Sequence, residues 1–316
     1  MKLNKVVEVE LEDIMKIHIN EVVTRDGFQM ESKIPSISYK LDLINSLIDA
    51  GIKNIELTSF VHPKYVPQMA DAEELFSKIP RRSDVTYSAI ALNERGVDRA
   101  QKAKADEINL VFSLSETHNR KNANQTVDES IQFVQKLLMG ESVLQEQIPI
   151  NIAISTAFGC PFEGLYTKEK LFPIIERIVE YNPNSINLAD TTGMANPKQV
   201  EETCYAVKSK WPNLKVGLHL HNTRGMGLAN VIAGIRGGVT HFDAALGGIG
   251  GCPFAPGATG NICTEDTVHM LEQMGYDTGI DVDKLILASR GLEKELEKTL
   301  SGQIMKAGKS SDTHTA

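Results

Sequence analysis

Short apolar runs recur along the chain, and the longer segments between them carry apolar residues at helical spacing. The runs with the length and composition of β-strands are residues 17–26, 52–60, 84–92, 107–114, 149–158, 185–190, 215–222 and 241–248. Most of them are apolar nearly without interruption, which is typical of parallel strands that helices cover on both faces. The pattern therefore predicts a succession of β-strands, each followed by a helix.

The segments between the runs have the period of amphipathic helices. Residues 36–51 repeat apolar side chains at helical spacing and end on Gly51, a common helix stop, and residues 197–211 and 225–238 show the same spacing. Eight β-then-α units in succession predict the α/β class and a (β/α)8 TIM barrel. A doubly wound open sheet is the alternative. It is disfavoured because the eighth unit is well formed and no G-x-G-x-x-G follows the first run.

The sequence predicts one domain. Its 316 residues suit a single large barrel, so we expect one catalytic domain over residues 1–316 with a helical tail from about residue 276. The net charge of −8 argues against a nucleic-acid partner, which requires a basic face. No apolar run is long enough to cross a membrane. The four cysteines form no C-x-x-C pair and the first residues lack a signal-peptide pattern, which together predict a cytoplasmic protein.

Polar residues stand at the ends of the predicted strands, where a barrel of this kind carries its chemistry. They are Arg25, Asp26, Gln29, Glu56, Asp190, Thr191, His219, His221 and Asn261. Closure of the barrel would bring them to one rim, although they are far apart in the sequence. Structural roles are open for some of them. Asp26 or Asp190 could cap the helix that follows, and Arg25 could form an ion pair with Glu56.

His219 and His221 are the most informative pair. In a strand, residues two apart point to the same face, and two buried imidazoles need either a metal ion or structural hydrogen bonds. With Asp26 and Asn261 they form a set of nitrogen and oxygen ligands that suits an octahedral divalent ion. Mg²⁺ and Mn²⁺ are the leading candidates, and Co²⁺ and Zn²⁺ are further ones. Arg25 beside this set suits an oxyanion or a carboxylate.

Several motifs together resemble the 3-hydroxy-3-methylglutaryl-CoA (HMG-CoA) lyase family. The resemblance spans about residues 17–290 and rests on TRDGFQ, IELTSFVHPKYVPQMAD, SETHNRKN, FGCPFEG, ADTTG, HLHNTRGMGLANV and GGIGGCPFAPGATGNICTED. The last motif is the most specific, because the related isopropylmalate and homocitrate synthases share the paired histidines but differ around the cysteine. The resemblance implies a homodimer that cleaves an acyl-CoA thioester into acetyl-CoA and acetoacetate, the chemistry of leucine catabolism and ketone-body formation.

The resemblance also implies roles for the matching residues. The metal ligands would be Asp26, His219, His221 and Asn261. The catalytic group would be Arg25, Asp26, Glu56, His219 and Cys252. The residues that contact or support the substrate would be Arg25, Gln29, Asp190, Thr191 and Glu265. Arg120 and Lys121 could hold the phosphates of CoA, although a solvated pair of loop residues fits their position equally well.

These roles agree with the chemistry of a retro-Claisen cleavage. The tertiary hydroxyl, bound to the metal, must lose its proton to Asp26 or His219, and the sequence does not decide between them. Arg25 would stabilise the charge that grows on the thioester oxygen by about 3 kcal/mol. Cys252 stands in a glycine-rich run, residues 247–261, that could close over the substrate, and its thiol could protonate the departing carbon. The alternative is a small buried cysteine.

Three positions depart from the pattern expected of this family. VVTRDG replaces a more usual Gly-Pro before Arg25, Ser32 stands where some members carry lysine, and Asn222 follows the paired histidines where aspartate is typical. We expect Asn222 to matter most, because a lost carboxylate would remove negative charge near the metal. The substrate could therefore be citramalyl-CoA or a longer 3-alkyl homologue. An acetyl-CoA condensing synthase and a non-catalytic metal-binding barrel are further alternatives. Cys252 in its glycine run disfavours the first, and the complete ligand set disfavours the second.

Overall fold

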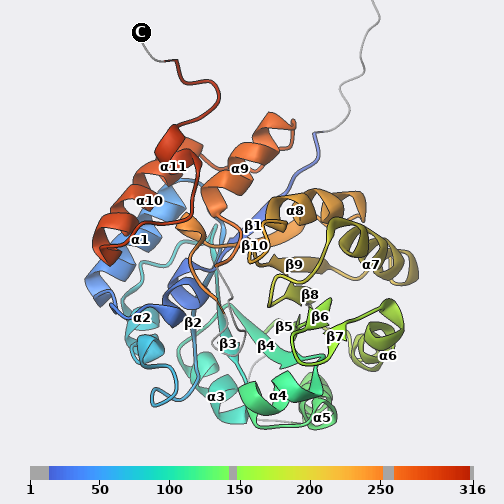
Figure 1. The fold of residues 1–316 in the computed structure, drawn as a ribbon. Coiled ribbons are helices and arrows are strands. Elements are labelled where there is room, and N and C mark those ends of the chain that lie inside the picture. The colour runs from blue at the N-terminus through green and yellow to red at the C-terminus, as the bar shows by residue number, and fades with distance from the viewer. Residues whose placement is uncertain (1–13, 142–147, 252–259, 314–316) are drawn as a thin grey trace, which may run out of the picture.

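The structure is a computed structural model that describes residues 14–141, 148–251 and 260–313. Parallel strands form a closed barrel at its centre (Figure 1). In chain order they are β1 (His18–Glu21), β2 (Asn54–Ser59), β3 (Thr86–Ala91), β4 (Glu107–Ser113), β5 (Ile150–Ser155), β8 (Ser185–Asp190), β9 (Val216–Leu220) and β10 (His241–Ala244). The strand β1 pairs with both β2 and β10, so the sheet closes. The predicted (β/α)8 barrel is confirmed, and the open sheet is excluded.

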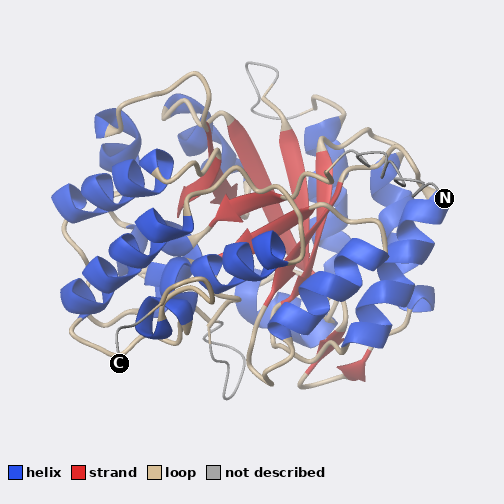
Figure 2. Cartoon of the chain, turned by 90° about the horizontal axis from the view of Figure 1, so that it is seen from above, coloured by secondary structure: helices blue, strands red, loops and turns tan. Residues whose placement is uncertain are grey.

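Helices surround the barrel and cover the outer faces of its strands (Figure 2). They are α1 (Ile37–Asp49), α2 (Ala72–Lys78), α3 (Glu94–Lys102), α4 (Glu116–Ala123), α5 (Val127–Leu138), α6 (Lys168–Val179), α7 (Pro197–Lys210), α8 (Gly227–Arg236) and α9 (Thr264–Gln273). The tail is helical, as predicted. It consists of α10 (Val282–Leu296), which packs on α1 and α9, and the short α11 (Ile304–Ala307). A small antiparallel pair, β6 (Gly159–Cys160) and β7 (Gly164–Leu165), forms a separate two-stranded sheet.

The first strand is shorter than its apolar pattern predicts. It ends at Glu21, and the chain then forms a wide π-helical turn, η1 (Val23–Gly27), and a 3-10 turn, η2 (Phe28–Met30). The buried carboxylate of Glu21 accepts the amide of Val23. The carbonyl of Val22 accepts hydrogen bonds from the amides of residues 25–27, and not from an amide of a neighbouring strand. This turn places consecutive residues of the TRDG motif at the carboxyl end of the barrel.

The inside of the barrel is polar, although the strands as a whole are apolar. A cavity of about 910 Å³ runs along the barrel axis, from His18 and His241 at the strand starts to Arg120 and Lys121 in α4. The interior positions carry Asn20, Glu56, Ser88, Asn109, Asn151, Asn187, His219 and Asp243. Most barrels of this class fill the same space with branched apolar side chains. No helix within the described ranges has the length and apolar character needed to span a bilayer.

Candidate active site

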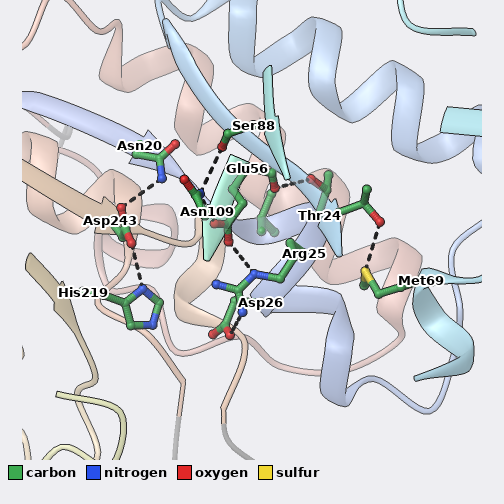
Figure 3. Close-up of polar contacts among 12 residues, drawn as sticks. Asn20, Thr24, Arg25, Asp26, Glu56, Met69, Ser88, Asn109, His219 and Asp243 are labelled. Atoms are coloured by element: carbon green, nitrogen blue, oxygen red, sulfur yellow. Dashed lines mark hydrogen bonds and ion pairs between the residues drawn. The ribbon is translucent and has the colours of Figure 1, made fainter. Parts of the chain in front are cut away.

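Arg25 lies in η1 at the wall of the cavity, between two carboxylates. Its Nε donates to Glu56 of β2, and its Nη1 donates to Asp26 Oδ1 at 2.5 Å (Figure 3). Glu56 also accepts the side-chain amide of Asn109. The ion pair with Glu56, left open by the sequence, is therefore present. It fixes the guanidinium at the cavity wall and does not remove it from the cavity.

Asp26, His219 and His221 form a compact buried group. Their candidate ligand atoms all lie within 4.8 Å of one another. The Nε2 atoms of the two histidines are 3.0 Å apart, and Asp26 Oδ2 lies 3.9 Å from His221 Nε2. Two ligands held at about 2.1 Å from one ion, at right angles to each other, would be about 3 Å apart. The two imidazoles are therefore spaced as ligands of a single ion would be.

Asn261 joins this group across the mouth of the barrel. A backbone bridge pairs it with His221, and its Nδ2 donates to Asp26 Oδ2 at 2.6 Å and to the carbonyl of Ile249 at 2.9 Å. Its Oδ1 is buried and has no hydrogen-bond partner among the described residues. An oxygen in that position is expensive to bury without a ligand. The predicted ligand set therefore lies together, and its chemistry fits a divalent ion.

The electrostatics keep Asp26 ionised. Burial by itself would raise the pKa of Asp26, but Arg25, followed by His219 and His221, outweighs burial and lowers this pKa to about 2. Glu56 shows the opposite balance. Burial raises the pKa of Glu56 above its usual range, although Arg25 opposes the shift. A carboxylate that stays charged in a buried site is a suitable ligand for a cation.

The remaining predicted residues divide into two groups. Gln29, Thr191, Arg120 and Lys121 line the cavity. Asp190 and Glu265 are buried away from it and hold backbone amides. Asp190 accepts hydrogen bonds from the backbone amides of Met194 and Ala195 and so stabilises the turn after β8. Glu265 accepts one from the backbone amide of Gly247. The predicted helix-cap alternative for Asp190 is thus close to what the structure shows. Cys252 lies outside the described residues.

Asn222 does not act as the sequence suggested. Its side chain is exposed, and its Oδ1 accepts the amide of Gly227 at the start of α8 at 2.9 Å. An aspartate could accept the same bond. The expected loss of negative charge beside the metal is therefore wrong, because the side chain at this position turns to the helix and not to the ligand group.

Sequence reasoning missed Asp243, Asn20 and Asn187. Asp243 of β10 accepts from Asn20 and from Asn187, and its Oδ2 lies 3.0 Å from Nδ1 of His219 (Figure 3). The available signal was a single aspartate within an otherwise apolar strand, in HFDAAL. A buried charge in a strand needs a partner. Only the strand order shows which residue that partner is.

Glu21 was also missed, and it holds the chain where the glycine-rich run begins. Its Oε1 accepts the amides of Val23 and Leu246, and its Oε2 accepts the hydroxyl of Thr264 at 2.7 Å. Burial raises the pKa of Glu21 to about 8, in spite of these hydrogen bonds. Burial likewise raises the pKa of Glu265, beside the same turn, to about 7.

We expect a Glu21→Gln variant to gain stability over the wild-type protein as the pH rises. Folded Glu21 keeps its proton up to a pKa of about 8, whereas the unfolded carboxyl releases it near 4.5, so the wild-type protein loses stability between these values. Glutamine needs no proton, and its oxygen can accept the same two amides. The free energies of unfolding in urea should be similar at pH 5 and differ by up to about 5 kcal/mol at pH 9.

The control for this experiment is Glu129→Gln. Glu129 is exposed in the capping box of α5, and hydrogen bonds to Thr126 lower its pKa, so it is ionised in both the folded and the unfolded chain above pH 5. The difference in stability between Glu129→Gln and the wild-type protein should therefore stay constant from pH 5 to pH 9. Parallel pH profiles for wild-type protein and Glu21→Gln would contradict the protonated state of Glu21.

The comparisons with known proteins agree on one family. Residues 16–291 match the model of the HMGL-like family. The chain belongs to this family. It is 38% identical over 296 residues to the hydroxymethylglutaryl-CoA lyase YngG of Bacillus subtilis, covering 94% of this chain and 98% of the relative. It is 39% identical over 302 residues to the (R)-citramalyl-CoA lyase of Chloroflexus aurantiacus, covering 92% and 95%.

A solved structure of an HMGL-like relative is similar over nearly the whole chain. The HMG-CoA lyase from Acinetobacter baumannii, in complex with coenzyme A and 3-methylmalate, has a TM-score of 0.90 and 44% sequence identity, covering 95% of this chain and 97% of the relative. The HMGL-like assignment accounts for the barrel and for the group formed by Asp26, His219 and His221, which could hold a metal ion.

Proposed function

We propose that the protein is a divalent-metal-dependent carbon–carbon lyase that cleaves HMG-CoA into acetyl-CoA and acetoacetate. The main support for the proposal is the position of Arg25. It lies at the wall of a polar cavity and is hydrogen-bonded to the candidate metal ligand Asp26. An oxyanion-stabilising cation thus lies next to a site for the substrate hydroxyl. The similarity to HMG-CoA lyases over most of the chain supports the same substrate class.

Asp26, His219, His221 and Asn261 would hold the ion. When bound, the ion lowers the pKa of the tertiary hydroxyl and orients it. The sequence left Asp26 and His219 open as the acceptor of the hydroxyl proton, and we assign it to Asp26. With Nε2 of His219 in the ligand group and its Nδ1 bonded to Asp243, this imidazole has no nitrogen free to accept a proton. The hydroxyl oxygen then becomes a carbonyl, the carbon–carbon bond breaks, and its electron pair moves into the thioester as an enolate.

Arg25 has the position needed to stabilise that enolate. Glu56 and Asp26 hold its Nε and Nη1, so the guanidinium is oriented before substrate arrives. A proton must finally return to the carbon of the departing acetyl-CoA, and we assign this step to Cys252. Arg120 and Lys121, on α4 at the cavity, are assigned to the phosphates of CoA.

The test is turnover of a small panel of CoA thioesters by the full chain with Mg²⁺ or Mn²⁺, following acetyl-CoA release. The panel contains HMG-CoA, citramalyl-CoA and a longer 3-alkyl homologue. We expect the highest kcat/KM with HMG-CoA. Preference for citramalyl-CoA would favour the second candidate, which the relative from Chloroflexus aurantiacus supports at 39% identity. No turnover of any member by metal-loaded protein would refute the lyase proposal.

Mg²⁺ or Mn²⁺ as the native ion, a homodimer and a cytoplasmic location stay predictions. Comparing turnover with Mg²⁺, Mn²⁺, Co²⁺ and Zn²⁺ tests the identity of the ion. Light scattering of the purified chain tests whether it is a homodimer.

A further inference from the structure

Three neighbouring strands place three polar side chains in one layer of the barrel. In the strand register, Asn20 of β1 is the partner of Asp243 of β10, and Asp243 is the partner of His219 of β9. All three line the cavity. Figure 3 shows their side chains in a row, with Asp243 between Asn20 and His219. The row therefore depends on the register of β1, β10 and β9 and not on any local turn.

Hydrogen bonds engage both oxygens of the Asp243 carboxylate. Asn20 Nδ2 donates to Oδ1 at 2.9 Å, and Asn187 Nδ2 donates to Oδ2 at 2.9 Å. The same Oδ2 lies 3.0 Å from Nδ1 of His219. The two amides hold the carboxylate, one at each oxygen. Oδ2 is thereby held as an acceptor directed at one nitrogen of His219.

We propose that Asp243 is the positioning residue for the metal ligand His219, holding its Nδ1–H so that the lone pair of Nε2 faces His221 and Asp26. A neutral imidazole carries its proton on one nitrogen only. The hydrogen bond between Nδ1 of His219 and the Asp243 oxygen favours the tautomer with its proton on Nδ1, which leaves the lone pair of Nε2 free for a metal ion. His219 Nε2 is the atom that lies 3.0 Å from His221 Nε2.

The hydrogen bond to Asp243 selects the tautomer of His219 and fixes the orientation of its ring. Without Asp243, the imidazole could carry its proton on Nε2, and that nitrogen could not bind a metal ion. Water in the cavity would not decide between the tautomers, because water both donates and accepts. Removing a residue that is hydrogen-bonded to a metal-binding histidine typically weakens metal affinity by about 10-fold to 100-fold. This inference rests on the proposed function only in taking the ligand group to bind a metal.

The test is a titration of the metal-free full chain with Mn²⁺, in which electron paramagnetic resonance counts the free ion. Asp243→Ala should weaken Mn²⁺ binding by about 10-fold to 100-fold. Asp243→Asn keeps an oxygen for His219 and should recover most of the affinity. The control is Asn151→Ala, a truncation in the same polar interior whose hydrogen bonds go to Glu107, Asn109, Asn184 and Ser185 and not to the ligand group. It should bind Mn²⁺ like the wild-type protein.

A second readout reports the tautomer directly. Long-range ¹H–¹⁵N spectra of histidine-labelled protein with Mg²⁺ should show His219 protonated at Nδ1, with this signature lost in Asp243→Ala. Wild-type Mn²⁺ affinity in Asp243→Ala, or a proton on Nε2 of His219 in the wild-type protein, would overturn the assignment.

If Asp243→Ala does not fold, Asn187→Ala replaces it, because it withdraws one donor from the same carboxylate. We expect several-fold weaker Mn²⁺ binding from it, and unchanged affinity would overturn the assignment. Mn²⁺ binding is measured without substrate, so protein that binds the ion but cleaves no thioester would refute the lyase proposal and leave the role of Asp243 intact.

Discussion

Replacing Arg25 with lysine is expected to lower kcat by about 10²-fold to 10³-fold, with little change in Mn²⁺ affinity. Arg25 uses Nε for Glu56 and Nη1 for Asp26, and the planar fork directs the rest of the group into the cavity. Lysine keeps a positive charge beside Asp26, but its ammonium group is compact and lacks the planar fork of the guanidinium. It cannot hold both carboxylates and still face an oxyanion. The loss should therefore fall on the chemical step, as measured by kcat with saturating HMG-CoA.

Arg99→Lys is the matched control. Arg99 donates through Nε and Nη2 to the carboxylate of Glu73 and through Nη1 to the carbonyls of Phe60 and Val61. It is thus an arginine held in an ion pair whose side chain does not line the cavity. Its variant should keep wild-type kcat. Wild-type kcat in Arg25→Lys would mean that the guanidinium serves only the ion pair with Glu56, the structural alternative that the sequence left open.

Replacing His221 with alanine is expected to abolish tight metal binding and to lower turnover by about 10³-fold. His221 contributes one of the two Nε2 atoms that lie 3.0 Å apart, and it is buried beside Asp26. Its loss leaves the ion fewer protein ligands and leaves Asp26 with less positive surroundings. Chelation of the wild-type protein should cause a similar loss of turnover, restored by adding Mg²⁺ or Mn²⁺.

His241→Ala is the control for this variant. His241 stacks on His18 with ring centroids 4.5 Å apart, at the start of β10, and in the strand register it is the partner of Gly217 and not of His219. It should bind Mn²⁺ and turn over substrate like the wild-type protein. Turnover that survives both chelation and His221→Ala would exclude a metal-dependent step.

The site could be predicted in part because its ligands stand in recognisable local patterns. The spacing of His219 and His221 indicates a shared strand face, and Asn261 and Asp26 follow predicted strand ends. Their assembly into one group agrees with that prediction. Asn222 was misjudged because its place next to His221 in the sequence suggested a place next to the metal. In the structure its side chain faces the start of α8.

Other features had no local signal. Glu21 is one polar residue in an apolar run, and nothing in the sequence shows that it accepts amides from both Val23 and Leu246. Burial among such partners also shifts its pKa, and burial depends on the packed fold. The polar lining of the barrel was hidden for a similar reason. Residues such as Asn109 and Asn151 appear as isolated polar positions until the strands are placed side by side.

The (β/α)8 architecture and the types of ligand could be predicted from the sequence, because strand length, helical period and the paired histidines are local properties of the chain. The hydrogen-bond partners of the buried polar residues depend on the tertiary structure. Barrel closure sets β1 beside β10 and β10 beside β9, which brings Asn20, Asp243 and His219 into one row. Strand register arises from packing and hydrogen bonding between segments more than 200 positions apart, such as Asn20 and Asp243, and no local pattern records it.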